Sequence, residues 1–169
     1  ITEFTQKIQP TKFSELVAIN AVWRPGAMQA AGVHYPEYKR NGQRLLHPFI
    51  DDILAETYGV IVYQEQFMSL YARVTGKDFG DADLARKILV KGQGKKNNPE
   101  WKSKLEALEN EFLQGCSNNG IPDDTAKTIW SEIETHSGYS FNKSHAVSYT
   151  MLSWQLAYYK YYFRTDFYC

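Results

Sequence analysis

Apolar residues recur at helical spacing along most of this chain, and glycine, asparagine or proline separates one such stretch from the next. The clearest stretch has apolar residues at positions i, i+3, i+4 and i+7, closed by a glycine: Phe67, Leu70, Tyr71, Val74 and Gly76. Similar stretches begin at Pro99 and Pro122 and end near Asn119 and at Gly138. This spacing places one apolar face of each helix against a core. We therefore expect a mainly α-helical fold.

Shorter helices are expected around these. Apolar spacing predicts a helix over residues 11–20, and Pro48 fits the first turn of another. Asp81 fits an N-cap, which predicts a short helix from that position. The last helix is expected to begin near Ser144 and to continue into an aromatic tail.

Other segments are expected to be irregular or extended. The polar stretch 34–47 and the basic, glycine-containing stretch 91–96 are predicted to be loops, the second of them mobile. Cys116 is predicted to lie in a loop rich in Gly and Asn. The composition of residues 59–63 is that of a strand.

Composition excludes several classes of protein. Of the 169 residues, 43% are hydrophobic and 22% charged, which excludes a wholly disordered chain. Two cysteines cannot build a disulfide framework or a zinc site with four cysteine ligands, so we expect a reducing compartment. Residues 146–163 are long enough to span a bilayer, but their Tyr, Trp, Ser and Lys side chains favour a soluble amphipathic helix and no membrane partner.

Both ends of the sequence suggest a piece of a larger protein. The chain starts at Ile1 without an initiator Met or a charged and apolar leader, and it stops within an aromatic run over 159–168. Residues 1–169 are expected to form a single domain.

Charge is balanced overall, with a formal net charge of +0, but it is segregated along the chain. Residues 105–134 carry seven acids against Lys127, whereas residues 84–96 carry no acid and five cations: Arg86, Lys87, Lys91, Lys95 and Lys96. Several cations on one flexible segment suit phosphate groups. The alternative is a solvated charged loop without a ligand.

A second candidate site is the segment 138–145, which reads Gly-Tyr-Ser-Phe-Asn-Lys-Ser-His. Free N–H groups at a helix N-terminus bind anions, and Lys143 and His145 would add charged donors there. The alternative is an ordinary capped turn with a surface histidine. Residues 63–66, Tyr-Gln-Glu-Gln, are interpreted as a solubilising polar face.

The sequence contains no evident catalytic or metal-ligating constellation. The four histidines show no metal-ligand spacing, and Cys116 has no neighbouring base that would activate it. No acidic pair stands out as a metal-binding dyad. We therefore assign no catalytic residue and no metal ligand.

Five short motifs occur in a definite order along the chain. They are AVWRPGAM at 21–28, HP at 47–48, TYGVIVYQEQ at 57–66, ADLARK at 82–87 and GYSFNKSHA at 138–146. This series resembles the fingers region of the C-family replicative DNA polymerases, the family of the bacterial DNA polymerase III alpha subunit, over nearly the whole chain. The resemblance implies a helical fingers domain, and it favours helix or turn over strand at 59–62.

The resemblance also implies a function. A fingers domain binds and positions the incoming deoxynucleoside triphosphate and the primer–template DNA for nucleotidyl transfer. The palm domain, whose aspartates hold Mg²⁺, would lie upstream of this chain, so the chain alone would be inactive although the full-length protein is a DNA-directed DNA polymerase. The remaining polymerase domains would be partners, and a sliding clamp would bind through regions outside this chain, in the nucleoid or the cytoplasm of an infected bacterium.

The same resemblance assigns site residues. Arg86 and Lys87 fall where the family has two adjacent basic residues facing the triphosphate, and Lys143 and His145 fall beside the same pocket. Arg24, in the Arg-Pro-Gly turn at the entrance to the fingers, is assigned to nucleotide binding with them. The remaining cations of the basic segment are expected to contact nucleic acid: Lys91, Lys95 and Lys96.

The sequence departs from the family pattern at three places. Lys87 stands where arginine is usual and lacks its bidentate fork, the stretch 88–96 is longer and richer in glycine, and Ser140 replaces a usual glycine. These departures suggest a divergent member, such as a phage polymerase. The rival interpretation is a non-catalytic helical module that binds nucleic acid or protein and only shares the fold.

Overall fold

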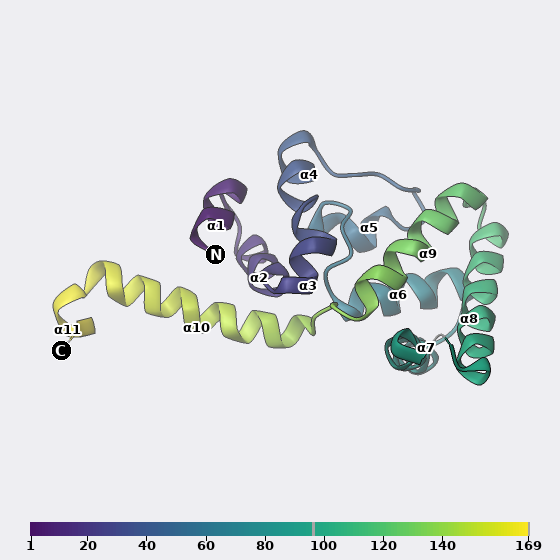
Figure 1. Ribbon diagram of the computed structural model, residues 1–169. Helices are drawn as coiled ribbons and strands as arrows, with labels where there is room; N and C mark the ends of the chain where they lie inside the picture. Colours follow the sequence, from purple (N-terminus) through teal and green to yellow (C-terminus); the bar gives the residue numbers. More distant parts are fainter. Residues whose placement is uncertain (96, 169) are drawn as a thin grey trace.

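The computed structural model describes residues 1–95 and 97–168 and is built from α-helices (Figure 1). The helices are α1 Thr2–Ile8, α2 Phe13–Val22, α3 Pro25–Ala27, α4 Tyr35–Asn41, α5 Asp51–Leu54, α6 Gln64–Thr75, α7 Phe79–Gly92, α8 Pro99–Asn118, α9 Asp123–Ser137, α10 Lys143–Tyr162 and α11 Arg164–Tyr168. A π-helical turn covers Met28–Gly32, and 3₁₀ turns cover Ala55–Thr57 and Gln93–Lys95. Within the described residues there is no strand, which confirms the mainly α expectation.

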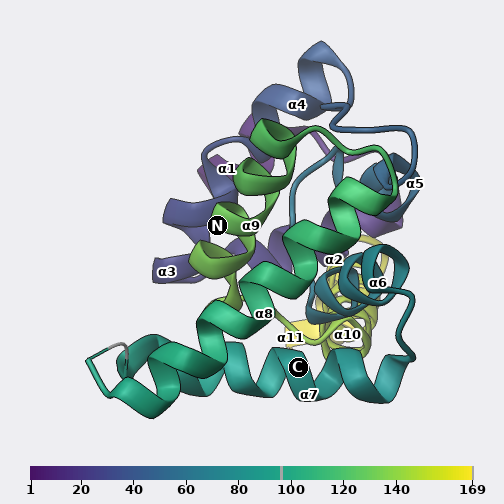
Figure 2. The same cartoon turned by 90° about the vertical axis from the view of Figure 1, so that its right-hand side faces the viewer.

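Two hydrophobic cores lie next to each other in the body of the molecule. In the first, α6 packs against α7 and α8, and α8 packs against α9, around buried residues such as Leu70, Phe112 and Ile129 (Figure 2). The second core joins α1, α2 and α4 to the start of α10 through Tyr35 and Ala146, among others. The stripes of apolar residues in the sequence face these cores, as helical spacing requires.

Residues 60–63 run as an extended segment between the two cores. Ile61 is buried in the core of α5–α9, whereas Val60, Val62 and Tyr63 are buried in the other. The strand expected from composition is wrong, since the only pairing in this segment is an isolated bridge between Tyr63 and Phe141. The helix or turn expected from the resemblance is found only at the Tyr58–Gly59 turn. Burial on both sides explains the β-branched composition.

Helix α10 leaves the body and extends away from it, ending near α11 (Figure 1). Its first turns are anchored on α2, where Ala146 and Thr150 are buried and the Asn20 side-chain amide donates to the Thr150 hydroxyl at 2.7 Å. Every residue from Met151 to Tyr162 is exposed. Among residues 1–95 and 97–168, no helix combines the length and apolarity needed to cross a bilayer.

Several predicted helix boundaries are confirmed. Asn98 caps α8 by accepting a hydrogen bond from the Glu100 N–H at 3.0 Å, with Pro99 in the first turn. Gly76 closes α6 in the left-handed conformation, with φ of 72°. Gly138 follows the last residue of α9.

Other local predictions are wrong. The stretch 34–47 contains helix α4, which has Pro36 in its first turn. Helix α7 is capped by Asp78 rather than Asp81, because the Asp78 carboxylate accepts from the Asp81 N–H at 2.9 Å. Cys116 is a fully buried residue of α8, and burial raises the pKa of its thiol to about 11.

Candidate functional site

The N-terminal ends of α6 and α10 meet in the body of the molecule (Figure 1). The Gln64 N–H donates to the Phe141 carbonyl oxygen at 3.0 Å, and the Phe141 N–H donates to the Val62 carbonyl oxygen at 3.2 Å. These two bonds form the isolated bridge that ties the two segments together. The segments 63–66 and 138–145, distant in sequence, therefore belong to one site.

The Glu65 carboxylate sits at the N-terminus of α10. Both of its oxygens accept from the Lys143 N–H at 3.1 Å, and one accepts from the Asn142 side-chain amide at 3.0 Å. The Asn142 side-chain oxygen in turn accepts from the His145 N–H at 2.9 Å. A carboxylate at this position satisfies free N–H groups and complements the helix dipole. The anion at the α10 N-terminus of this structure is thus a side chain of the protein itself.

The Lys143 side chain is paired with a second carboxylate. Its ammonium forms an ion pair with Glu56, and it lies 5.6 Å from the centre of the buried Tyr63 ring. The side chains of Lys143 and Glu56 are each 38% exposed. Because solvent reaches both partners, this pair can open and re-form, so Lys143 remains available to an anionic ligand.

His145 lies on the surface one position beyond Ser144. Its ring centre is 4.5 Å from that of Tyr149 and 5.2 Å from that of Phe141. The imidazole is exposed and flanked by aromatic rings. This placement suits a surface histidine and leaves the ring open to a ligand, so its assignment to the nucleotide stays a prediction.

Arg24 packs beneath the turn that precedes α10. Its guanidinium donates to the Tyr139 and Ala21 carbonyl oxygens and lies 4.4 Å from the centre of the Phe141 ring. Burial lowers the pKa of Arg24. The neighbouring Gly26 has no room for a side chain, because an added Cβ would lie 2.0 Å from the Tyr139 ring. Arg24 therefore holds the backbone of this turn in the present structure.

Arg86 and Lys87 share one carboxylate on α7. Arg86 donates to one Asp83 oxygen from Nε at 3.0 Å and from Nη2 at 2.8 Å, and Lys87 pairs with the other oxygen at 2.7 Å. These contacts from Lys87 and Arg86 lower the pKa of Asp83. Arg86 also lines a cavity of about 10 Å³ together with Ser137 and Ser140, so it lies against the turn that leads into α10.

Residues 91–95 do not form the loop that the sequence predicts. Lys91 belongs to α7, and Lys95 belongs to the following 3₁₀ turn, with its ammonium 4.9 Å from the centre of the Trp101 ring. Lys96 lies outside the described residues. The Gln93 side-chain amide donates to the Glu134 carbonyl oxygen and to the Ser137 hydroxyl. Lys91 to Lys95 are therefore helical and are connected to α9 through Gln93, whereas the mobility expected from the glycine content stays a prediction.

The structure brings some of the predicted site residues together and leaves others apart. Arg24, Lys143 and His145 surround the joined ends of α6 and α10, and Arg86 approaches the same turn from α7. Within the described part of the chain, no hydrogen bond or ring contact links Arg86 or Lys87 directly to Lys143 or His145. Lys91 and Lys95 lie farther along α7 and beyond its end.

Sequence analysis missed the acidic residues that organise this site. Glu65 lies in the Tyr-Gln-Glu-Gln stretch that was interpreted as a solubilising face, and Glu56 and Asp83 were not singled out. Each pairs with a predicted site residue. The pairing of Asp83 with Arg86 could have been predicted from the sequence, because residues at i and i+3 are neighbours on a helix. The partners of Glu56 and Glu65 are too distant in sequence for any such signal.

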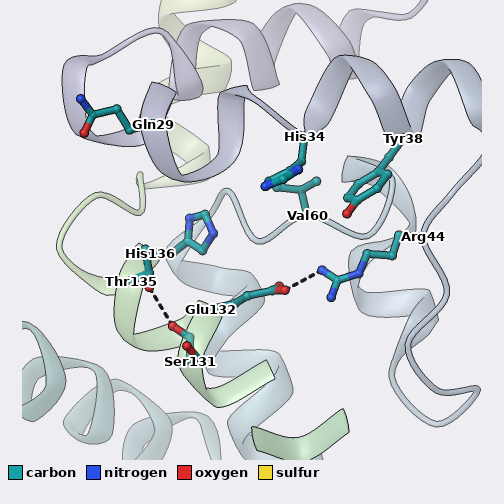
Figure 3. Close-up of a pocket in the computed structure, with 9 residues that line it drawn as sticks. All are labelled: Gln29, His34, Tyr38, Arg44, Val60, Ser131, Glu132, Thr135 and His136. Atoms are coloured by element: carbon teal, nitrogen blue, oxygen red, sulfur yellow. Dashed lines mark hydrogen bonds and ion pairs between the residues drawn. The ribbon is translucent and has the colours of Figure 1, made fainter. Parts of the chain in front are cut away.

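A separate cavity of about 430 Å³ lies between α4 and α9 (Figure 3). Tyr38 of α4 and His34, the residue before α4, line it on one side. His136 lines it from α9, where burial and the nearby His34 lower the pKa of His136 to about 4. Arg44 reaches into it but pairs with Glu132 at 2.6 Å. Because the lowered pKa keeps His136 neutral at pH 7 and the Arg44 guanidinium is paired with Glu132, neither group offers a free positive charge to a phosphate.

Among residues 1–95 and 97–168, no group of three or more His, Cys, Asp or Glu side chains is placed to hold a metal ion. The acidic residues of the site are instead engaged with lysine, arginine and backbone N–H groups.

Comparison with known sequences identifies related proteins. Residues 1–120 match the family of bacterial DNA polymerase III alpha subunit finger domains. The DNA polymerase III alpha subunit of Halalkalibacterium halodurans is 39% identical over 168 residues, which cover 96% of this chain. Those of Aquifex aeolicus and Thermus aquaticus are 36% and 33% identical, over 98% and 99% of this chain. The chain spans 14% of the length of each of these three relatives.

Proposed function

This chain belongs to the family of bacterial DNA polymerase III alpha subunit finger domains, and we propose that it positions the incoming deoxynucleoside triphosphate against primer–template DNA within a full-length DNA polymerase. The observation that carries this proposal is the approach of Arg86 to the Ser137–Ser140 turn, which leads directly into Lys143. Arg86 on α7 and Lys143 at the start of α10 are thereby connected through one turn.

The chemistry of nucleotidyl transfer suits such an arrangement. Phosphoryl transfer depends mainly on positioning and on neutralising negative charge, so cations on a helical domain can complete a site whose metal ions lie elsewhere. Arg86 and Lys87 rest on Asp83, and Lys143 rests on Glu56, in partly exposed ion pairs. A triphosphate can replace these carboxylates as the partner of each cation.

Arg24 is proposed to act on nucleotide binding indirectly, through the turn before α10. Its contacts with Tyr139 and Phe141 support a role in shaping the turn before Lys143. His145 is proposed as an additional donor to the triphosphate, supported by its exposed ring beside Lys143. Lys91 and Lys95, with Lys96, are proposed to contact the phosphates of nucleic acid from the far end of α7.

Other polymerase domains are proposed as partners. The exposed large apolar side chains of α10 between Met151 and Tyr162 support this, because a stretch of such side chains on a surface normally marks an interaction site. A sliding clamp is proposed to bind the polymerase through regions outside this chain. The proposed setting is the bacterial nucleoid or the cytoplasm of an infected bacterium.

Mg²⁺ is proposed to bind aspartates of a palm domain outside this chain. The described residues of this chain do not fit a Mg²⁺ site, because they offer no suitable cluster of carboxylates. No step is therefore assigned to a metal held here. On this basis the purified 169-residue chain should show no template-dependent incorporation of nucleotides, whereas the full-length polymerase should.

The proposal is tested by removing the charges of α7 in a full-length polymerase. Replacing Arg86 and Lys87 by Gln should raise KM for the nucleotide or lower kcat, while the Kd for duplex DNA changes little. Lys127→Gln, on α9, is the matched control. A collapse of DNA affinity with unchanged nucleotide kinetics would instead favour the rival function, a helical module that binds nucleic acid.

A further inference from the structure

Gln93 connects the end of α7 to the end of α9. Its side-chain amide donates to the Glu134 carbonyl oxygen and to the Ser137 hydroxyl, and the Ser137 hydroxyl donates to the same carbonyl oxygen at 2.9 Å. Gln93 lies one residue beyond α7, and Ser137 is the last residue of α9. One side chain therefore joins the helix that carries Arg86 to the turn that leads into α10.

Two glycines, Gly138 after α9 and Gly92 at the end of α7, allow the segments around Gln93 to pack closely. An added Cβ at Gly138 would lie 2.5 Å from the Gln93 side-chain oxygen, so the turn has no room for a larger residue while Gln93 stays in place. At Gly92, an added Cβ would lie 2.9 Å from the Leu105 side chain of α8. The end of α7 is thus packed against α8 and hydrogen-bonded to α9 at successive residues.

Gln93 also lies between two glycines, Gly92 and Gly94. A segment of this composition would be expected to add mobility next to the cations of α7. In the structure, this segment consists of the end of α7 and a 3₁₀ turn, and the Gln93 hydrogen bonds connect it to α9. The segment therefore supplies a link between α7 and α9.

We propose that Gln93 is a positioning residue for nucleotide binding, which keeps the Arg86 and Lys143 sides of the site in fixed register. This rests on the proposed function, in which both cations meet one triphosphate. Without the two hydrogen bonds, α7 can shift relative to the α9–α10 turn. The nucleotide would then have to order the two sides as it binds, and its apparent affinity would fall.

The test uses Gln93→Met in a full-length polymerase, because methionine has similar length and no donor. We expect KM for the nucleotide to rise roughly 3- to 10-fold, with kcat and the Kd for duplex DNA changed less than 2-fold. Gly94→Ala is the matched control, since nothing lies within 4 Å of a Cβ there and its φ is not in the left-handed region. A lower melting temperature with unchanged KM would overturn the proposal and leave Gln93 a purely structural residue.

A second comparison holds even if Gln93→Met folds poorly. Gly138→Ala should raise KM in the parent polymerase, because the new methyl group displaces the Gln93 side chain. In a Gln93→Ala background the same substitution should have at most a 2-fold effect; an undiminished effect there would contradict the proposal. Arg86→Gln distinguishes a failure of the proposed function from a failure of this inference. Unchanged KM and unchanged kcat in Arg86→Gln would refute the proposed function. A raised KM or lowered kcat there, with no effect of Gln93→Met, would refute only this inference.

Discussion

The Glu65 carboxylate bonds the backbone N–H of Lys143 through both oxygens at 3.1 Å, although 78 residues separate the two positions. Glu65 lies in the first turn of α6, and Lys143 is the first residue of α10. Each helix therefore begins against the other, and the Glu65 carboxylate of α6 adds to the cap that Asn142 provides at the start of α10. This relationship places the Lys143 side chain at the surface beside Glu56.

Glu65→Ala should destabilise the chain by about 1–2 kcal/mol, because it leaves the first N–H of α10 without its carboxylate. Glu65→Gln should cost less, since an amide oxygen still accepts a hydrogen bond. Urea unfolding of the variants measures both values. Glu106→Ala is the control, because Glu106 is exposed and its ion pair with Lys102 is long, at 3.8 Å. Equal effects of Glu65→Ala and Glu106→Ala would show that the cap contributes nothing.

Glu56→Gln should lower the nucleotide KM of a full-length polymerase roughly 2- to 5-fold, because it removes the carboxylate that competes for Lys143. The effect should disappear in a Lys143→Ala background, where there is no ammonium to release. Steady-state primer extension measures KM in all four combinations. A KM that rises in Glu56→Gln would mean that Glu56 orients Lys143 for the nucleotide instead of competing for it.

Gly26→Ala should destabilise the chain by about 1–3 kcal/mol, because the added Cβ would lie 2.0 Å from the Tyr139 ring. The loss should be smaller in a Tyr139→Ala background, where the ring is gone. Thermal unfolding of the single and double variants gives the coupling between the two positions. Independent, additive losses would show that Gly26 and Tyr139 do not pack as described.

Stability should depend on the ionisation of Glu15 below about pH 5. Burial by itself would raise the pKa of Glu15, but hydrogen bonds from Lys39, Tyr58 and the backbone of Thr11 and Lys12 lower it to about 2. Because the pKa of Glu15 is lower in the folded state, its ionisation stabilises the folded state fully at pH values above the unfolded pKa of about 4.5. That contribution is lost as the pH falls toward 2, the pKa in the folded state. At pH 7 it amounts to roughly 3 kcal/mol at most.

The measurement compares urea unfolding of the parent chain and of Glu15→Gln between pH 7 and pH 3. The difference in unfolding free energy between them should be largest at pH 7 and should shrink as the pH falls. A difference that stays constant over this range would refute the assignment.

The sequence predicts helices best where the signal is local. Asn98 and Pro99 at the start of α8, and Gly76 at the end of α6, act through residues within one turn, and their roles are confirmed. Asp78 and Asp81 both suit an N-cap by residue type, so composition could not choose between them. Helix α4 was missed because Pro36 and Gly42 suggest a loop, whereas here they stand in its first turn and just past its end.

The site is less predictable because its contacts join distant parts of the chain. Motif order identified Arg24, Arg86 and Lys143 as candidates. The structure places Arg24 and Lys143 at the start of α10 and Arg86, on α7, against the turn that precedes α10. Their carboxylate partners depend on how α6, α7 and α10 pack. The conformation of the extended segment 60–63 was also hard to predict from the sequence. Its strand-like composition reflects burial between two cores, which only the tertiary structure reveals.

The most direct test of nucleotide positioning measures single-turnover incorporation at varied nucleotide concentration by a full-length polymerase. Arg86→Gln and Lys143→Gln should each raise the nucleotide Kd roughly 10- to 100-fold, the range expected when a charge-assisted hydrogen bond to phosphate is lost. The Kd for primer–template DNA should stay within about 2-fold of the parent. Unchanged nucleotide Kd in both variants, together with weakened DNA binding, would contradict the assignment of this domain to the incoming nucleotide.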